Sequence, residues 1–375
     1  MTKFIKIIPG FLLCIFIMIS SLYIADRLGA IVNQFQGLPA SASSPISSIF
    51  IAIILGLLIR NLIGLKEQFT HGVTFSLKII LKLGIVLLGI RLSFYDVITL
   101  GAWGIPIILT CVIAGLTITL WITEKLKQSH RLGTLTAVGT GICGVTAIVG
   151  TAPGIKANDE EIAYAIGNIT IFGILAMFIY PHLAYFIFNN DPIRIGLFLG
   201  TSIHETAQVA GAALIYDQIY NMPQVVDIAT ITKLTRNSLL IAVVPIMSYY
   251  YLNKKNESRG EKHNTPTWYK LIPLFVVGFI AMAIVRTIGD NGVTEHGLAF
   301  GLFEYEQWTN IWTNINTLGS KYMLGIAMAG VGLSTNLSVF KGVGAKPFYI
   351  GMAAALTVTV VSLIMVFLLG GLIKM

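Results

Sequence analysis

Long runs of apolar residues, separated by short polar segments, dominate the chain. Each run is close to the ~20 residues that a helix needs to cross the hydrocarbon core of a bilayer. Strands of a membrane β-barrel would instead alternate apolar and polar residues over about ten positions. The pattern therefore predicts an all-α polytopic membrane protein with eleven spans, near residues 8–25, 44–64, 74–94, 102–122, 133–155, 160–187, 193–215, 224–251, 268–287, 316–337 and 345–373.

The composition supports one integral membrane domain over residues 1–375. Apolar residues make up 55% of the chain and charged residues 11%, with a mean hydropathy of +0.80, whereas soluble domains carry about 25% charged residues. The longest polar stretch, near 253–268, is too short to fold alone. Residues 8–25 lack a small-residue cleavage site after them, so they are interpreted as a retained first span rather than a signal peptide.

The net charge of +8 reflects basic residues in the short loops, which favours a membrane topology over nucleic-acid binding. With a cytoplasmic N-terminus, 17 Lys and Arg residues fall inside and 6 outside, leaving Lys233 and Arg236 within a span. The positive-inside rule then predicts a cytoplasmic N-terminus and an external C-terminus. The three cysteines lie in apolar segments, so no disulfide framework is indicated.

Span 133–155 is rich in glycine and contains the stretch VGTGICGVTAIVGTAPG. Glycine weakens a helix and proline removes a backbone donor, so an interruption is expected here. An interrupted helix presents a positive N-terminal end that suits an anion. Close helix packing through small residues is the alternative. The candidate substrate-binding residues of this span are Gly141, Cys143, Gly144 and Thr146.

Span 193–215 contains the polar stretch GTSIHETAQ, in which the zinc motif H-E-x-x-H fails because Gln208 occupies the fifth position. On a continuous helix, Ser202, His204, Glu205 and Gln208 would form a polar stripe. Ionisable groups inside a membrane are functional candidates by default. Ser202, His204 and Gln208 are therefore candidate substrate ligands, and Glu205, aided by His204, is the candidate coupling group. A structural hydrogen-bond ladder is the alternative.

Span 224–251 supplies the opposite charge through Lys233 and Arg236, which lie three residues apart. We expect one of them to pair with Glu205 and the other to contact an anion, because Arg suits bidentate recognition of oxyanions. A buried ion pair that only fixes helix positions is the alternative. Arg91, at the end of another span, is expected to extend its charge to the interface.

A weak internal repeat links LGIVLLGIRLS at 83–93 with LGIAMAGVGLS at 324–334, which match at six of eleven positions. The two segments belong to spans that cross in opposite directions, and inverted repeats are typical of transporters. Chance similarity is the alternative, since Gly, Leu and Ile are abundant.

The blocks GTGICGVTAIVGTAPGIKANDEEIAYAIGNITIFG, GTSIHETAQVAGAA and DIATITKLTRNSLL, in this order, resemble the YeiH-type family of bacterial membrane proteins, whose members are named as sulfate exporters. The resemblance covers nearly the whole chain. It implies kinship with the bile acid/arsenite/riboflavin transporter superfamily and inverted repeats near 44–187 and 193–373, with span 8–25 peripheral to them. It also implies two broken helices that cross at the midplane, span 133–155 and a partner in span 316–337, which contains Gly319, Gly325, Gly330 and Gly332.

These features together predict a secondary transporter that exports a small anion of the sulfate or sulfonate class across the bacterial plasma membrane. The chain has no Walker-type loop, so a proton or sodium gradient is expected to supply the energy. No other cofactor is expected, and a homo-oligomer is left open. An anion channel is the rival interpretation. An intramembrane enzyme is disfavoured because no nucleophile–base motif is present.

Overall fold

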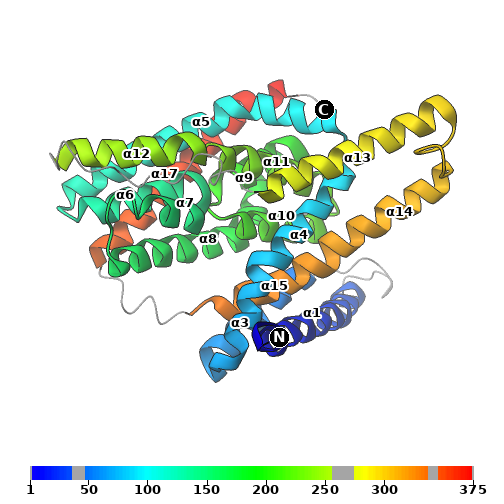
Figure 1. Cartoon of the computed structure of the whole chain (residues 1–375), viewed down its shortest axis with the longest axis horizontal. Helices are drawn as coiled ribbons and strands as arrows, with labels where there is room; N and C mark the ends of the chain where they lie inside the picture. Colours follow the sequence, from blue (N-terminus) through cyan, green and yellow to red (C-terminus); the bar gives the residue numbers. More distant parts are fainter. Residues whose placement is uncertain (1, 36–46, 256–273, 337–344, 374–375) are drawn as a thin grey trace. The chain divides into compact units, whose positions relative to one another are not determined.

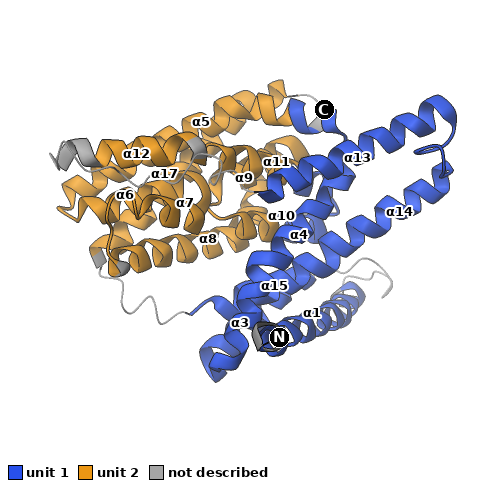
Figure 2. Ribbon diagram, in the orientation of Figure 1, with its two compact units in different colours: residues 1–99, 213–227, 274–337 blue, residues 100–212, 228–273, 338–375 orange. Residues whose placement is uncertain are grey.

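The computed structural model describes residues 2–35, 47–255, 274–336 and 345–373, and its regular secondary structure is helical apart from one isolated bridge between Ala299 and Phe303 (Figure 1). The chain divides into two compact units (Figure 2). Unit 1 comprises residues 1–99, 213–227 and 274–337, and unit 2 comprises residues 100–212, 228–273 and 338–375. Each unit takes segments from both halves of the sequence. The predicted all-α polytopic membrane fold is confirmed.

Unit 1 packs its helices closely through glycine. A Cβ added at Gly56 would lie 2.6 Å from the carbonyl oxygen of Ala329, and one added at Gly10 would lie 2.0 Å from that of Phe69. Such close backbone approach is typical of helix packing in membranes. The elements that lie wholly in this unit are α1 (Thr2–Phe35), α2 (Ser48–Leu58), η1 (Ile59–Ile63), α3 (Glu67–Phe75), η2 (Ser76–Ile80), α4 (Leu81–Leu88), η3 (Gly89–Arg91), α13 (Leu274–His296), α14 (Tyr305–Thr317), η6 (Leu318–Met323) and α15 (Leu324–Ser334).

Unit 2 contains the segments in which the candidate site residues lie. Three helices have residues in both units: α5 (Phe94–Lys125), α10 (Thr206–Tyr220) and α11 (Gln224–Ser238). The other elements of unit 2 are α6 (His130–Val138), η4 (Gly139–Cys143), α7 (Gly144–Thr151), α8 (Asp159–Phe188), α9 (Pro192–Ser202), α12 (Leu240–Lys255), α17 (Ala345–Leu369) and η7 (Gly370–Leu372).

The segment α6–η4–α7 is a re-entrant hairpin. At the start of α6, Arg131 Nε donates a hydrogen bond of 3.1 Å to the hydroxyl of Tyr251 in α12. Just after α7, a Cβ added at Gly154 would lie 2.6 Å from Ser248 Oγ, one turn earlier in α12. The chain therefore enters and leaves at the same end of unit 2. The prediction that span 133–155 crosses the membrane is wrong, because the chain reverses direction after η4.

The pair α9 and α10 forms a second re-entrant hairpin. Added Cβ atoms at Gly196 and Gly200 of α9 would lie 2.5 Å from Ile228 and 2.6 Å from Thr232 of α11, so α9 and α11 run parallel. A short turn joins α10 to α11, and the hydroxyl of Thr206 at the start of α10 accepts a hydrogen bond from the far end of α11. Because α10 runs antiparallel to α11, it also runs antiparallel to α9. Span 193–215 therefore does not cross either.

Although neither hairpin crosses the membrane, the predicted side of most loops stays the same. Each returns the chain to the side from which it came, so two lost crossings leave the side of later residues unchanged. In the predicted orientation Lys156 moves to the cytoplasmic side and Arg194 to the external side, so the balance of 17 to 6 basic residues is preserved.

Seven helices of the described residues are long and apolar enough to cross a membrane, and the segment Ser48–Ile63 is a shorter apolar helix. The seven are Lys6–Ile31, Glu67–Arg91, Val97–Lys125, His130–Thr151, Glu160–Phe188, Leu274–His296 and Lys346–Leu372. One of them, His130–Thr151, is the re-entrant α6–α7 segment, because length and composition alone cannot reveal a reversal. With the two re-entrant segments removed, the other nine of the eleven predicted spans stay predictions.

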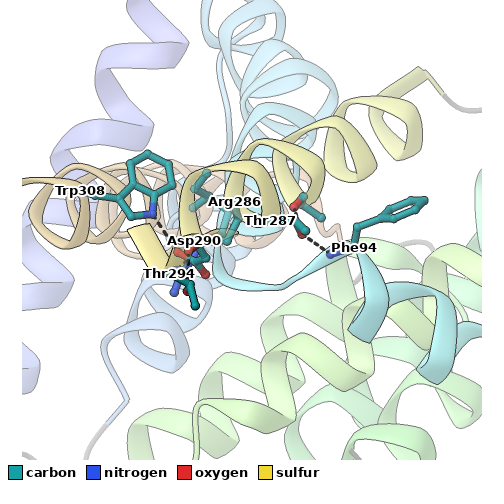
Figure 3. Close-up of polar contacts among 8 residues, drawn as sticks. Phe94, Arg286, Thr287, Asp290, Thr294 and Trp308 are labelled. Carbon is teal, nitrogen blue, oxygen red and sulfur yellow. Dashed lines mark hydrogen bonds and ion pairs between the residues drawn. The ribbon is translucent and has the colours of Figure 1, made fainter. Parts of the chain in front are cut away.

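A polar cluster in unit 1 joins α13 to α14. Arg286 Nε lies 2.6 Å from a carboxylate oxygen of Asp290, and Trp308 Nε1 donates a 2.8 Å hydrogen bond to the other oxygen (Figure 3). The Arg286 guanidinium also lies 3.8 Å from the ring centroid of Trp312. These contacts fix α14 against α13 without using a backbone carbonyl of either helix.

Candidate functional site: the two hairpin tips of unit 2

The tip of the first hairpin is the turn from η4 into α7. Gly144 has φ +43° and ψ −125°, a conformation that residues with a Cβ rarely adopt. The preceding residues Thr140, Gly141 and Ile142 form the last turn of the entering arm, and all three are buried. The predicted interruption near Gly141–Gly144 is confirmed, and glycine at 144 is what allows the reversal.

The tip of the second hairpin is the segment between α9 and α10. Helix α9 ends at Ser202, Ile203 is extended with φ −87° and ψ 139°, and α10 begins at Thr206. The prediction of a polar stripe along one continuous helix is therefore wrong. Ser202 donates its hydroxyl to the carbonyl of Phe198, and the Gln208 amide donates to the carbonyl of Thr170 in α8.

Two fully buried cations from α11 connect the two tips. Lys233 Nζ donates to the carbonyl oxygens of Ile142 at 2.9 Å, Ile203 at 3.0 Å and His204. Its three ammonium protons are thereby matched by three carbonyl acceptors. One acceptor belongs to the first tip and two belong to the second.

Arg236 repeats this pattern one helical turn further along α11. Its Nε donates to the carbonyl of Gly141 at 2.8 Å, and its two terminal nitrogens donate to the carbonyls of Thr140, Thr201 and Ile203. Both side chains have no exposed area. The carbonyl ends of η4 and α9 carry the negative ends of helix dipoles, which explains why two cations are stable there.

The expected ion pair between Glu205 and one of these cations is replaced by backbone contacts. Among the described residues, none donates a hydrogen bond to the Glu205 carboxylate or forms an ion pair with it. Lys233 is close enough to interact with it electrostatically. Glu205 is half-buried rather than fully enclosed. Its carboxylate is therefore the charged group at the tips that is not committed to holding the fold.

The N-termini of α7 and α10 lie together beside Glu205. Cys143 Sγ lies 3.7 Å from Thr206 Oγ1, and a Cβ added at Gly144 would lie 3.2 Å from the Cβ of Glu205. Thr206 Oγ1 also accepts a 3.1 Å hydrogen bond from Asn237 Nδ2. Thr146 in the first turn of α7 is exposed, and Thr206 is half-buried. The accessible part of the tips is thus formed by two helix N-termini, hydroxyl groups and one carboxylate.

The structure brings most of the predicted site residues together, but several of them have roles other than the predicted ones. Lys233 and Arg236 saturate backbone carbonyls, while Ser202 and Gln208 make hydrogen bonds elsewhere. His204 and Asn237 are buried, and one polar atom of each, Nδ1 and Oδ1, has no hydrogen-bond partner among the described residues. The gathered residues are Gly141, Cys143, Gly144, Thr146, His204, Glu205, Lys233 and Arg236. Thr206 and Asn237 were not among the predicted site residues, although Thr206 directly follows Glu205 and Asn237 lies four residues after Lys233.

The predicted partner of span 133–155 also needs correction. Residues 316–337 were expected to contain the second broken helix, but α14, η6 and α15 follow one another directly through Ser334, in unit 1. The interruption that joins the tip at Gly144 is instead the one at residues 203–205. The glycines of 316–337 serve close packing, since a Cβ added at Gly332 would lie 2.2 Å from the carbonyl of Ile53.

Arg91 does not extend to the interface as expected. It forms an ion pair of 3.2 Å with Asp227 inside unit 1, and its side chain is only 14% exposed. A carboxylate partner keeps a buried guanidinium neutralised, which makes extension to water unnecessary.

These features define a multi-pass α-helical membrane protein with two re-entrant hairpins whose tips meet around buried cations. The chain belongs to the family described as conserved hypothetical protein 698, whose family model matches residues 9–351. Its relatives include a UPF0324 membrane protein of Streptococcus agalactiae serotype V, 33% identical over 363 residues, which are 97% of this chain and 98% of the relative.

Two other relatives give the same result. A UPF0324 membrane protein of Fusobacterium nucleatum is 31% identical over 324 residues, covering 85% of this chain and 89% of the relative. One of Bacillus anthracis is 33% identical over 326 residues, covering 85% and 86%. Their names describe membrane proteins and specify no substrate. The resemblance to the YeiH-type family is consistent with this membership.

Proposed function

We propose that this protein is a secondary transporter that exports a small anion of the sulfate or sulfonate class across the bacterial plasma membrane. The observation that carries the proposal is the meeting of the α7 and α10 N-termini at the two hairpin tips. In this proposal the N-terminus of the chain is cytoplasmic and the C-terminus external.

An anion is the expected substrate because of the charge around the tips. Each helix N-terminus presents free N–H groups and the equivalent of roughly +0.5 charge. Lys233 and Arg236 add positive charge behind the tips. Because their donors are engaged by backbone carbonyls, they do not bind the substrate directly. Thr146 and Thr206 offer hydroxyl donors on the accessible side. Such a site attracts an oxyanion yet allows it to leave, as transport requires.

Glu205 is the proposed coupling group. It is half-buried, lies beside Gly144 and has no hydrogen-bond donor among the described residues. When ionised it reduces the positive charge that an anion meets, and when neutralised by a proton or Na⁺ it restores that charge. Binding of the coupling ion would therefore favour binding of the anion, a positive linkage under which the two cross the membrane together. Net export then follows when the outward force on the anion, to which an inside-negative membrane potential contributes, exceeds the inward force on the coupling ion.

Purified protein in proteoliposomes tests this proposal through flux of radiolabelled sulfate and a panel of alkyl sulfonates. We expect saturable, counterflow-competent flux that responds to a pH or sodium gradient. Glu205→Gln should abolish gradient-driven flux while preserving counterflow, because the charge is removed but the helix N-termini remain. Glu124→Gln is the matched control in unit 2, since the Glu124 side chain is 48% exposed.

Two outcomes would contradict the proposal. Unsaturable conductance without counterflow would identify an anion channel, and normal gradient-driven flux by Glu205→Gln would exclude Glu205 as the coupling group. Flux of no anion in the panel would remove the transporter assignment for this substrate class.

A further inference from the structure

The backbone carbonyl groups at the two hairpin tips accept hydrogen bonds from two cationic side chains of α11. Six residues contribute oxygens to Lys233 and Arg236: Thr140, Gly141 and Ile142 from the first tip and Thr201, Ile203 and His204 from the second. In sodium-coupled transporters, unwound carbonyls and C-terminal ends of half-helices supply the ligands for Na⁺. Here the same type of oxygen cluster is filled by side chains of the chain itself.

We propose that Lys233 and Arg236 are resident counter-cations that occupy the place of a sodium ion, so that the hairpin tips assemble and work without Na⁺. The part of this inference that concerns transport rests on the proposed function, and it leaves the proton as the coupling ion. The part that concerns the fold stands on the contacts alone.

Geometry and charge both oppose a bound sodium ion at this place. Lys233 and Arg236 are three residues apart on α11 and fully buried, so an added cation would meet two like charges at short range in a medium of low dielectric constant. Na⁺ would also need several oxygen ligands, and the backbone carbonyls that the two interrupted helices supply already accept hydrogen bonds from Lys233 and Arg236. A proton needs only one acceptor, and the Glu205 carboxylate offers it.

The groups around Glu205 are consistent with proton binding. Among the described residues, the titratable side chains at the tips are His204 on its own hairpin, Cys143 on the other hairpin, Cys111 on α5, and Lys233 and Arg236 on α11. Apart from Glu205, none of these groups is a carboxylate. In the part of the chain that the structure describes, this cluster therefore offers no anionic cage for a metal cation, but it contains a single protonatable carboxylate.

The first test measures the thermal unfolding of the purified protein in NaCl and in choline chloride at equal ionic strength. Wild-type protein should unfold at the same temperature in both salts. Lys233→Ala removes the ammonium group, frees the carbonyls of Ile142 and His204 and leaves Ile203 with only its hydrogen bond from Arg236, so this variant should gain a sodium-specific rise in unfolding temperature. Lys125→Ala, an exposed position on α5, is the control and should respond like wild type.

A sodium-specific shift in wild-type protein would overturn the inference, and so would the absence of any shift in folded Lys233→Ala. A variant that folds in NaCl but not in choline chloride would support it. If the variant folds in neither salt, equilibrium binding of radioactive sodium to wild-type protein decides: no binding supports the inference, and binding overturns it.

The second test measures anion flux driven by a pH gradient in proteoliposomes, with Na⁺ replaced by choline on both sides. The rate should be unchanged. A rate that falls severalfold without Na⁺ overturns the inference but leaves the transporter assignment intact. Failure to transport any anion would remove the proposed function, while the unfolding experiment would still test the role of Lys233.

Discussion

Unit 1 and unit 2 neutralise cations in different ways: the paired arginines of unit 1 are half-buried and the cations of α11 in unit 2 are fully buried. In unit 1, Arg286 pairs with Asp290, which also accepts from Trp308, and Arg91 pairs with Asp227; Arg286 adds one long hydrogen bond of 3.4 Å to the Ile90 carbonyl. In unit 2, Lys233 and Arg236 donate to backbone carbonyls of two interrupted helices. A pair of side chains joins helices that would exist without it. Cations on backbone carbonyls stabilise chain conformations that no regular helix could provide.

The difference also determines what happens to the carboxylates. Asp290 and Asp227 are engaged with their arginines, so their charges belong to the structure of unit 1. Glu205 lies near Lys233, whose hydrogen bonds go to backbone carbonyls, so its charge is not fixed by a partner. A carboxylate without a structural partner is able to bind and release a proton without loosening the fold.

The largest expected effect is on stability, and it distinguishes an arginine bound to backbone carbonyls, Arg236, from an arginine paired with a carboxylate, Arg286. Arg236→Met leaves several buried carbonyls without a donor and should lower the free energy of unfolding by about 3–5 kcal/mol. Arg286→Met should cost about 1 kcal/mol, because the Asp290 side chain is 43% exposed and water can solvate it. Thermal unfolding of the purified variants in detergent provides the measurement. Equal destabilisation by the two substitutions would contradict the comparison.

A smaller effect is expected at the tip of the first hairpin. Gly144→Ala forces a Cβ into a backbone with φ +43° and places it 3.2 Å from Glu205, so we expect a cost of about 1–3 kcal/mol. Gly150→Ala in the same α7 helix is the control, since its added Cβ would lie 3.9 Å from Val244. That variant should be neutral or more stable by about 0.5–1 kcal/mol. A stable Gly144→Ala protein would show that the reversal does not depend on glycine.

The smallest perturbation tests the path of the hairpin itself. Single cysteines at Lys125 and Glu160, in a protein lacking its three native cysteines, should leave stability unchanged because both positions are exposed. A membrane-impermeant maleimide should label both from the same side of the membrane and a cysteine at Asn190 from the other side. Labelling of positions 125 and 160 from opposite sides would restore a crossing helix at 133–155.

Several structural features could be predicted from the sequence because they depend on local composition. Apolar runs predicted helices, and the seven long apolar helices of the described chain fall on predicted spans. The glycines of 139–144 predicted an interruption because glycine weakens a helix. The polar residues of 201–208 and 233–236 marked the region of the tips, because buried ionisable groups are costly in a membrane without a partner.

The sequence could not reveal the direction of the chain after each interruption. A broken helix that continues across the membrane and one that turns back have the same composition, so both re-entrant hairpins were predicted as crossings. Their direction depends on distant contacts, such as Arg131 with Tyr251 and Gly196 with Ile228.

The sequence by itself determined that this chain is a helical membrane protein and that its unusual charges lie at residues 204–205 and 233–236. Only the tertiary structure decided which groups those charges meet. Sequence reasoning pairs cations with carboxylates, because charges are visible in a sequence and unpaired carbonyls are not. Backbone carbonyls become acceptors for Lys233 and Arg236 only where helices end, and the folded arrangement brings two such ends to the same place on α11.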